Sequence, residues 1–317
     1  MLTIGVDLGG TKLLGVVATE TGAVVGERLQ PTALGPEAVL ADIAATVAEL
    51  RTDVPDAAAV GVGLPGMVDL GGVVHYAPNL PGFEGVRARS HLARTCGLPV
   101  VVDNDANAAA LGEVLHGAAR GHSEVLLVTL GTGIGGGIVT GGRVYRGGYG
   151  LAAEIGHFTV DPAGPRCACG ANGHWEALAS GTALGRLGRE WAARGDAPNV
   201  LARAGGDPTA VTGQDVGDSA RAGEPDGLAV LSAYARAVAL GLGGLINIFD
   251  PEIVVVAGGL VQLGNVLLDR VRAELPAFVE GAEHRPLPPV VPAALGDRAG
   301  AIGAAALARR LVDGSAR

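Results

Sequence analysis

Short apolar runs recur along this chain and predict β-strands. Most of them are rich in Val, Leu, Ile or Ala and stop at Gly, Pro or Asp. Runs of this length bounded by turn residues are typical of strands that are covered on both faces. The runs predicted as strands are 2–6, 13–18, 59–64, 99–102, 125–130, 138–140 and 251–257.

Longer stretches between these runs have the spacing of helices. After Pro36, residues Leu40, Ile43, Val47 and Leu50 fall on one helical face and predict a buried stripe. The stretches predicted as helices are 36–50, 108–115, 180–194, 228–249 and 300–312, and the polar stretch 195–227 is expected to hold short helices. Strands that alternate with helices predict an α/β protein.

Glycine-rich turns follow three of the predicted strands. The first reads D-L-G-G-T-K from Asp7 to Lys12, the second is 131–137, and the third is Gly258-Gly259. Backbone N–H groups in such turns can converge on a phosphate, although an ordinary hairpin turn explains the first one equally well. The second matches G-x-G-x-x-G, but no helical stripe follows, which argues against a dinucleotide site. Strand, glycine turn and strand thus occur twice, which suggests two related halves facing each other across a cleft.

Two further strand ends and one loop hold candidate ligand-binding residues. Asp103, Asn104 and Asp105 come directly before a predicted helix, and three such residues exceed what one helix cap needs. Gly66 lies in the turn after 59–64, at a sheet edge where α/β proteins bind ligands. Asn79, in a loop with two prolines, is either a turn former or a ligand contact.

A loop between Glu154 and Glu176 gathers two cysteines and two histidines. Cys167, Cys169, His157 and His174 are residue types that bind Zn²⁺, and a metal would order a loop rich in Gly and Pro. The alternative is that His174 is an ordinary surface residue, since C-x-C is shorter than the usual C-x-x-C spacing. A disulfide between the two cysteines would form a strained ring.

Composition excludes several classes of protein. The chain has 317 residues, a formal net charge of −9 and 3% aromatic residues, which argues against a nucleic-acid surface. The uncharged run 125–142 is broken by glycines, so we expect no membrane span there. The N-terminus meets Asp7 almost at once and has no signal-peptide pattern. A cytoplasmic protein with no nucleic-acid or membrane partner is the expectation.

Six motifs together resemble the ROK family, the bacterial sugar kinases and sugar-responsive repressors of the actin-like ATPase superfamily. The motifs are D-L-G-G-T-K at Asp7, L-P-G-M-V-D at Leu64, N-D-A-N-A-A-A at Asn104, G-T-G-I-G-G-G at Gly131, E-I-G-H at Glu154 and C-A-C-G-A-N-G-H-W-E at Cys167. The resemblance spans essentially the whole chain and looks closest to bacterial glucokinases. It implies an actin-like ATPase (ribonuclease H-like) fold, with two α/β domains around a cleft.

The resemblance also implies domain limits and an activity. Residues 1–117, completed by a C-terminal helix 300–317, would form one domain, and 118–299 the other. The activity would be transfer of the γ-phosphoryl group of ATP to the 6-hydroxyl of glucose, with Mg²⁺, in a homodimer or homotetramer. A kinase for fructose, mannose or N-acetylmannosamine, use of polyphosphate as donor, and a non-catalytic sugar sensor stay open. Repressors of the family carry an N-terminal helix-turn-helix, whereas this chain begins at its first strand.

Roles for individual residues follow from the same resemblance. Asp105 would be the base that takes the hydroxyl proton. Asp7 would help to hold Mg²⁺ through water. The sugar would be bound by Gly66, Asn79, Asn104, Asp105, Glu154, His157 and Glu176. The nucleotide would contact Asp7, Gly9, Gly10, Thr11, Lys12, Gly131, Thr132, Gly133, Gly258 and Gly259.

The metal loop departs from the family pattern at one position. The family site resembles one His and three Cys, and His174 stands where the third Cys is expected. The expected zinc ligands are therefore His157, Cys167, Cys169 and His174, in a site that is either more sensitive to pH or has lost the metal. His157 could serve zinc through one nitrogen and the sugar through the other.

Overall fold

The structure is a computed structural model that describes residues 1–314, and the chain divides into two compact units. The first unit comprises Met1–Leu127, Gly137–Ala153 and Ala293–Arg317, and the second comprises Val128–Gly136 and Glu154–Pro292. The segments 118–127, 137–153 and 293–299 lie in the first unit, although the expected domain limits put all three in the other. Residues 315–317 of the expected C-terminal helix are outside the described part of the chain.

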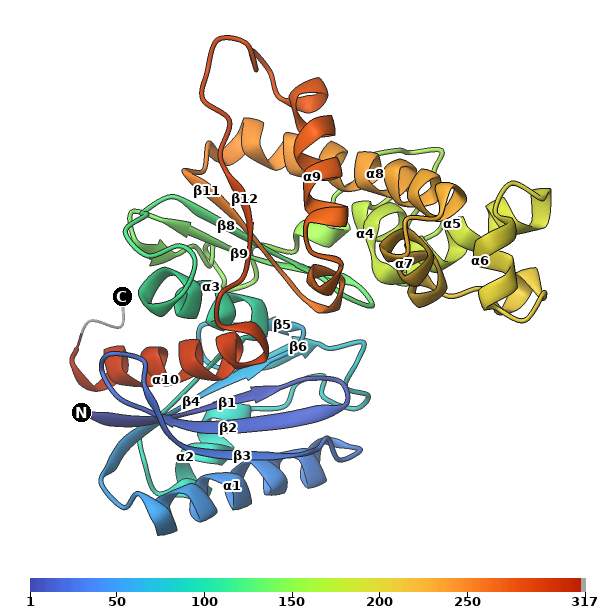
Figure 1. The fold of residues 1–317 in the computed structure, drawn as a ribbon. Helices are drawn as coiled ribbons and strands as arrows, with labels where there is room; N and C mark the ends of the chain where they lie inside the picture. Colours follow the sequence, from blue (N-terminus) through green and yellow to red (C-terminus); the bar gives the residue numbers. More distant parts are fainter. Residues whose placement is uncertain (315–317) are drawn as a thin grey trace. The chain divides into compact units, whose positions relative to one another are not determined.

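A five-stranded mixed sheet forms the centre of the first unit (Figure 1). Its strands run in the order β3-β2-β1-β4-β7. They are β1 (Leu2–Leu8), β2 (Lys12–Ala18), β3 (Val24–Pro31), β4 (Ala57–Leu64) and β7 (Val100–Asn104). The pairs β1–β2 and β2–β3 are antiparallel, whereas β1–β4 and β4–β7 are parallel. The carboxyl ends of β1, β4 and β7 therefore lie at one edge of the sheet.

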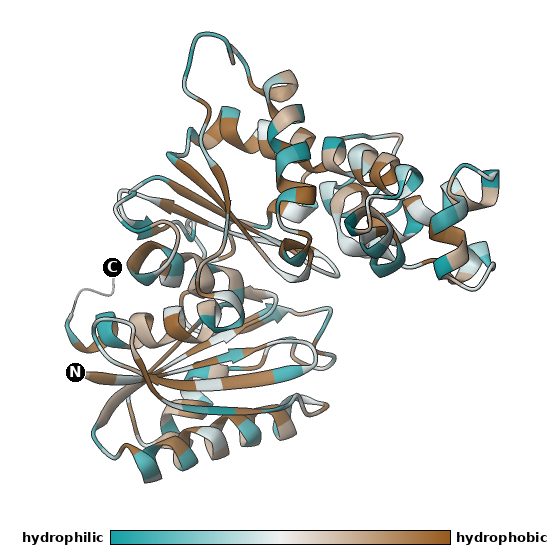
Figure 2. Cartoon of the chain, in the orientation of Figure 1, coloured by the Kyte–Doolittle hydropathy of each residue, from teal (hydrophilic) through white to brown (hydrophobic). Residues whose placement is uncertain are grey.

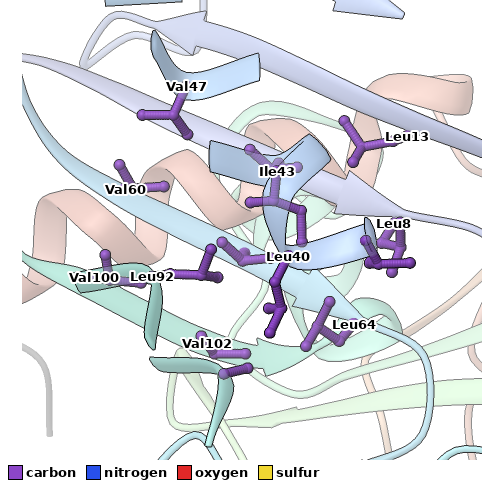
Figure 3. Packing of buried hydrophobic residues seen from close by; sticks show 14 of the residues in the cluster. Leu8, Leu13, Leu40, Ile43, Val47, Val60, Leu64, Leu92, Val100 and Val102 are labelled. Atoms are coloured by element: carbon purple, nitrogen blue, oxygen red, sulfur yellow. The ribbon is translucent and has the colours of Figure 1, made fainter. Parts of the chain in front are cut away.

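Two helices, α1 (Pro36–Asp53) and α2 (Ala88–Cys96), cover one face of this sheet (Figure 1). The core between them and the strands contains Leu8, Leu13, Val60, Leu64 and Val102, and Figure 3 shows them packed with residues of both helices. The stripe predicted for the first helix is confirmed: its four leucine, isoleucine and valine residues are all at most 5% exposed. Amphipathic spacing and strand pleating together account for this core.

The opposite face of the sheet is covered by α10 (Ala299–Val312) and α3 (Asp105–His116) at unusually short range. A Cβ added at Gly5 would lie 1.9 Å from Ala301 O, and one at Gly61 would lie 1.8 Å from Ala304 O. Gly5 of β1 and Gly61 of β4 each stand between two Val or Ile residues, so the pleat puts these glycines under α10 and the Val and Ile side chains on the other face. Small residues are thus a packing requirement here.

The second sheet repeats the strand order of the first. It runs β10-β9-β8-β11-β12, so that in both sheets the third, second, first, fourth and fifth strands of the set stand side by side. Its strands are β8 (Val125–Leu130), β9 (Ile134–Thr140), β10 (Arg143–Val144), β11 (Ile253–Ala257) and β12 (Val290–Pro292). This order confirms the two related halves suggested by the repeated glycine turns.

Helices make up most of the second unit outside the strands. They are α4 (Trp175–Ala179), α5 (Gly181–Arg194), α6 (Pro198–Arg203), α7 (Gly213–Arg221), α8 (Pro225–Phe249) and α9 (Asn265–Glu274). Among the described residues, α8 is the one helix long and apolar enough to cross a membrane, but 61% of its apolar window is buried inside the structure. That burial is what a core helix shows. Figure 2 shows the same apolar bias along the strands of both sheets.

Several elements were missed by hydrophobic pattern alone. These are β3, α2, the hairpin β5 (Met67–Val68) and β6 (Val74–Tyr76), α9 and β12. β3 is an edge strand with no fully buried residue, and α2 has only two buried residues, so neither has a strong apolar signal. The helix expected at 108–115 begins earlier, at Asp105.

Replacing Gly61 with alanine tests the short approach of α10. The methyl group would overlap the Ala304 carbonyl, so we expect a loss of roughly 2–4 kcal/mol of unfolding free energy, measured by urea denaturation. Gly148→Ala is the matched control, because a Cβ there meets nothing within 4 Å. Equal stability of the two variants would contradict this packing.

Candidate functional site

Two carboxylates lie side by side at the carboxyl edge of the first sheet. Asp7 ends the polar face of β1, and Asp105 is the first residue of α3, directly after β7. Gly63 on β4 stands between them: a Cβ there would lie 3.4 Å from Asp7 Oδ1 and 3.2 Å from Asp105 Cα. The fold therefore brings together two of the predicted site residues that are far apart in sequence.

Both side chains are half-buried, and burial raises the pKa of each carboxyl group. Burial is the main cause that raises the pKa of Asp7 to about 8, and the neighbouring Asp105 raises it further while Lys12 lowers it. Burial likewise raises the pKa of Asp105, although the backbone N–H of Ala106 donates to its Oδ1 at 2.9 Å. Close carboxylates with raised pKa values are typical of sites that bind a cation or move a proton.

The turn before α3 resolves which residue caps the helix. Asn104 is the N-cap, with its Oδ1 accepting from Asn107 N at 3.1 Å, and its Nδ2 donates to Gly66 O at 3.1 Å. Asp103 is only 4% exposed and forms an ion pair with Arg146. The side chain of Asp105 is therefore not needed as a cap, and Gly66 and Asn104 are tied to each other beside it.

The first glycine turn closes as a hairpin. Gly9 N donates to Lys12 O at 2.8 Å, and Thr32 Oγ1 donates to Gly9 O at 2.8 Å. Gly10, Thr11 and Lys12 are exposed at its tip. The Lys12 ammonium pairs with Asp297 at 2.5 Å. The turn is thus a hairpin that also offers an exposed hydroxyl and a cation.

The second glycine loop, in the other unit, is braced by α5. Gly181 N donates to Gly131 O at 2.7 Å, and Thr182 Oγ1 donates to Thr132 O at 2.8 Å. Strand β9 follows the glycines directly, so the rejection of a dinucleotide fingerprint is confirmed. Gly258 has φ +88° and packs so closely on the end of β8 that a Cβ would lie 2.5 Å from Leu130 O. Only glycine fits that backbone, which sets the third glycine turn beside the second.

The predicted metal ligands come together in the second unit. One ligand atom from each of His157, Cys167, Cys169 and His174 lies within 4.8 Å of the others. A backbone bridge between Thr159 and His174 brings the two histidines together. Cys169 Sγ lies 3.2 Å from His174 Nδ1, and Cys167 Sγ lies 3.8 Å from His157 Nδ1.

The two sulfur–nitrogen distances are close to those between the ligands of a tetrahedrally coordinated ion. Ligands at the Zn–S and Zn–N lengths of a zinc site stand about 3.3–3.8 Å from one another. Burial raises the pKa of Cys167 to about 11, with contributions from Cys169 and Glu176, and a divalent cation would favour the thiolate instead. The four side chains are therefore a candidate metal centre, with two nitrogen and two sulfur donors.

Glu176 connects this cluster to the second glycine loop. Its Oε2 accepts from Ile134 N at 2.9 Å, and its Oε1 accepts from the Cys167 thiol at 3.4 Å. A Cβ at Gly133 would lie 2.4 Å from the same Oε2, which explains the glycine there. Trp175, fully buried, donates through Nε1 to Ala237 O of α8 and fixes the start of α4. These contacts fix the position of Glu176 at the start of α4.

Two other predicted sugar contacts lie at the surface of the chain. Asn79 and Glu154 are exposed, and Glu154 O accepts from His157 N at 3.0 Å. The expectation that residues of both units share one site stays a prediction. Sequence reasoning also missed Arg146, Asp297 and Thr182, which contact predicted site residues but belong to no motif; their partners are distant in sequence, so no local pattern signals them.

Comparison with known proteins shows the family of this chain. The model of the ROK family matches residues 3–311. The chain belongs to the ROK family. A glucokinase of Streptomyces coelicolor is 42% identical over 97% of this chain and 98% of its own length, and a glucokinase of Thermotoga maritima is 37% identical over 98% of both.

A solved structure of the ROK family supports the fold. The ROK glucokinase from Streptomyces griseus, in complex with glucose and AMPPNP, has a TM-score of 0.86 and 40% identity, covering 98% of this chain and 100% of its own. The actin-like ATPase fold implied by the family resemblance is thereby confirmed, together with its α/β class. The family resemblance drawn from the six motifs is confirmed as well.

The raised pKa of Asp7 predicts a pH-dependent stability in protein without Mg²⁺. A carboxyl whose pKa rises from 3.8 when unfolded to about 8 when folded stabilises the fold below pH 4, and this contribution is lost as the pH rises to about 8. Asp7→Asn removes the buried charge, so we expect it to be more stable than the natural protein at pH 9, by roughly 1–3 kcal/mol, with a smaller difference at pH 5.

Urea denaturation at both pH values provides the measurement. Asp313→Asn, which alters an exposed carboxyl, is the control and should change stability equally little at pH 5 and pH 9. An Asp7→Asn variant that loses stability at pH 9 would show that Asp7 is well solvated or well paired.

Proposed function

We propose that this ROK protein is a glucokinase that transfers the γ-phosphoryl group of ATP to the 6-hydroxyl of glucose, giving glucose 6-phosphate and ADP. The observation that carries the proposal is the paired carboxylates at the sheet edge, in a chain 40% identical to a glucokinase bound to glucose and AMPPNP. Phosphoryl transfer needs little covalent chemistry from the protein, so positioned carboxylates and backbone donors are the required parts.

The first unit supplies the base and most sugar contacts. Asp105 takes the proton of the attacking hydroxyl, and its raised pKa brings its basicity closer to neutral pH. Asn104 and Gly66 retain hydrogen-bonding capacity beside it: the Asn104 amide has one more N–H and one more lone pair than its protein partners use. Asn79 would contact the sugar from its loop. Amide and carboxylate groups of this kind discriminate between sugars by leaving the wrong epimer unpaired.

Glycine turns in both units bind the nucleotide in this proposal. Gly9, Gly10, Thr11 and Lys12 would approach the phosphates from one turn, and Gly131, Thr132 and Gly133 from the other, with Gly258 and Gly259 beside the adenosine. Lys12 would exchange Asp297 for a phosphate oxygen. Asp7 would hold Mg²⁺ through water, and Mg²⁺ bound with ATP neutralises charge on the phosphoryl oxygens.

The metal loop completes the sugar site. His157, Cys167, Cys169 and His174 would hold a structural Zn²⁺, whose chemistry is to fix the loop. His157 lies toward Cys167 through Nδ1, which leaves Nε2 for a sugar hydroxyl. Glu154 and Glu176 would accept from other hydroxyls. A cytoplasmic homodimer or homotetramer stays the prediction for the assembly.

Asp105→Asn separates chemistry from binding. An amide cannot accept the proton, so we expect kcat to fall at least ~100-fold in a coupled ADP assay. Glucose binding, measured by calorimetry, should stay within a few-fold of that of the natural protein, because the hydrogen-bonding atoms remain. Asp196→Asn, on the exposed surface, is the control. Turnover retained by Asp105→Asn would remove Asp105 as the base.

Metal analysis tests the cysteine and histidine cluster without reference to activity. The purified protein should carry about one zinc ion per chain, and a chelator should lower its melting temperature. Cys167→Ser should lose the ion, whereas Cys96→Ser, at a half-buried cysteine outside the cluster, should keep it. His174→Cys should bind the ion at least as tightly at pH 6 as the natural protein does. Natural protein that carries no zinc and binds none on addition would refute the site.

A further inference from the structure

We infer that Arg146 is a positioning residue for the proposed phosphoryl transfer: it holds the carboxylate of Asp103 and thereby fixes the turn that presents Asn104 and Asp105. The inference deepens the proposed function and rests on it for its kinetic part. No motif of the sequence contains Arg146, and its role is visible only from the folded chain.

The guanidinium of Arg146 contacts one carboxylate oxygen of Asp103, Oδ2. Nε donates to Oδ2 at 2.8 Å, Nη2 lies 2.6 Å from the same oxygen in an ion pair, and Nη1 donates to Val144 O at 3.3 Å. The side chain of Asp103 is 5% exposed and that of Arg146 is 27% exposed. A charge-assisted hydrogen bond with a second close N–O contact, in such surroundings, is geometrically specific as well as strong.

The other oxygen of Asp103 organises the turn itself. Oδ1 accepts from Asn104 N at 2.8 Å and from Asn107 Nδ2 at 3.0 Å. Asn107 is 1% exposed and lies in the first turn of α3, where its backbone N–H donates to Asn104 Oδ1. Asp103 therefore connects the end of β7 to the first turn of α3, and Asp105 lies between the two points that it joins.

Arg146 reaches this turn from a distant part of the chain. The chain leaves the second glycine loop along β9, returns through β10, and then places Arg146 within the unit that contains Asp103. Arg310 of α10 is close enough for Arg146 to contribute, after burial, to lowering the pKa of the Arg310 guanidinium. A cation beside another cation needs a counter-charge, and Asp103 provides it.

A buried ion pair of this kind is weak evidence for added stability, since desolvation of both groups offsets their attraction. The consequence of the Arg146–Asp103 pair lies in the position of the turn that it holds. With Arg146 removed, Asp103 would keep a buried charge without its ion pair and without the Nε hydrogen bond, and would turn toward other donors. Asn104 and Asp105 would then move, and displacement of a catalytic group by about 1 Å can cost on the order of 100-fold in rate.

The test compares Arg146→Gln, Arg146→Lys, Asp103→Asn and the double variant Arg146→Gln with Asp103→Asn. We expect Arg146→Gln to lower kcat by at least ~10-fold while the KM for ATP stays within ~2-fold. Arg146→Lys, which keeps the charge, should recover part of the loss. The double variant should be no slower than the slower single variant, because residues that act as a pair are not additive. Arg143→Gln, at an exposed position on β10, is the control.

Hydrogen exchange supplies a readout that does not depend on catalysis. In Arg146→Gln, the amides of 104–107 should exchange faster, while those of α1 and α8 keep their rates. An unchanged kcat, additive losses in the double variant, or faster exchange throughout the chain would each overturn the inference. If the natural protein phosphorylates no hexose, the proposed function fails, and the local exchange difference alone then decides whether Arg146 fixes the turn.

Discussion

Close packing of α10 on the first sheet limits how well the carboxyl group of Asp7 is solvated. A Cβ at Gly300, in the first turn of α10, would lie 2.4 Å from Asp7 Cγ, so the helix leaves no room for water on that side of the carboxyl. The same helix rests on Gly5 and Gly61 of the sheet. Glycine and alanine are therefore distributed where backbone must meet backbone, and the raised pKa of Asp7 follows from that contact.

Desolvated carboxylates destabilise a fold unless cations or hydrogen bonds compensate them. The carboxylates of Asp7, Asp103 and Asp105 have different environments. Asp103 has Arg146 and two N–H donors, whereas Asp105 has the N–H of Ala106, and Asp7 has the partial help of Lys12. Asp103 is well paired and holds the turn. Asp7 and Asp105 are poorly compensated, so in the proposed function they interact with ligands. Residues that break the rule of paired burial are expected at functional sites rather than elsewhere.

The sequence predicted the strands and helices with strong apolar patterns, and the motifs located the turns between them. It placed Asp105 near a helix start, but only the structure shows Asn104 as the cap and Asp105 as the first helical residue. Elements with weak amphipathic signal, such as β3 and α2, were missed. Arg146 and Asp297 were missed because their partners, Asp103 and Lys12, are joined to them by folding alone. The four candidate metal ligands were predicted because cysteine and histidine are rare residues that stand close together in sequence.

In the proposed reaction, the carboxylate of Asp105 meets the hydroxyl that receives the phosphoryl group. A crystal structure of this protein with glucose and a non-hydrolysable ATP analogue tests it most directly. We expect an Asp105 oxygen within hydrogen-bonding distance of the glucose 6-hydroxyl, with that hydroxyl directed at the γ-phosphorus. A sugar bound with its 6-hydroxyl beyond the reach of Asp105, or held by other residues with Asp105 turned away, would contradict it.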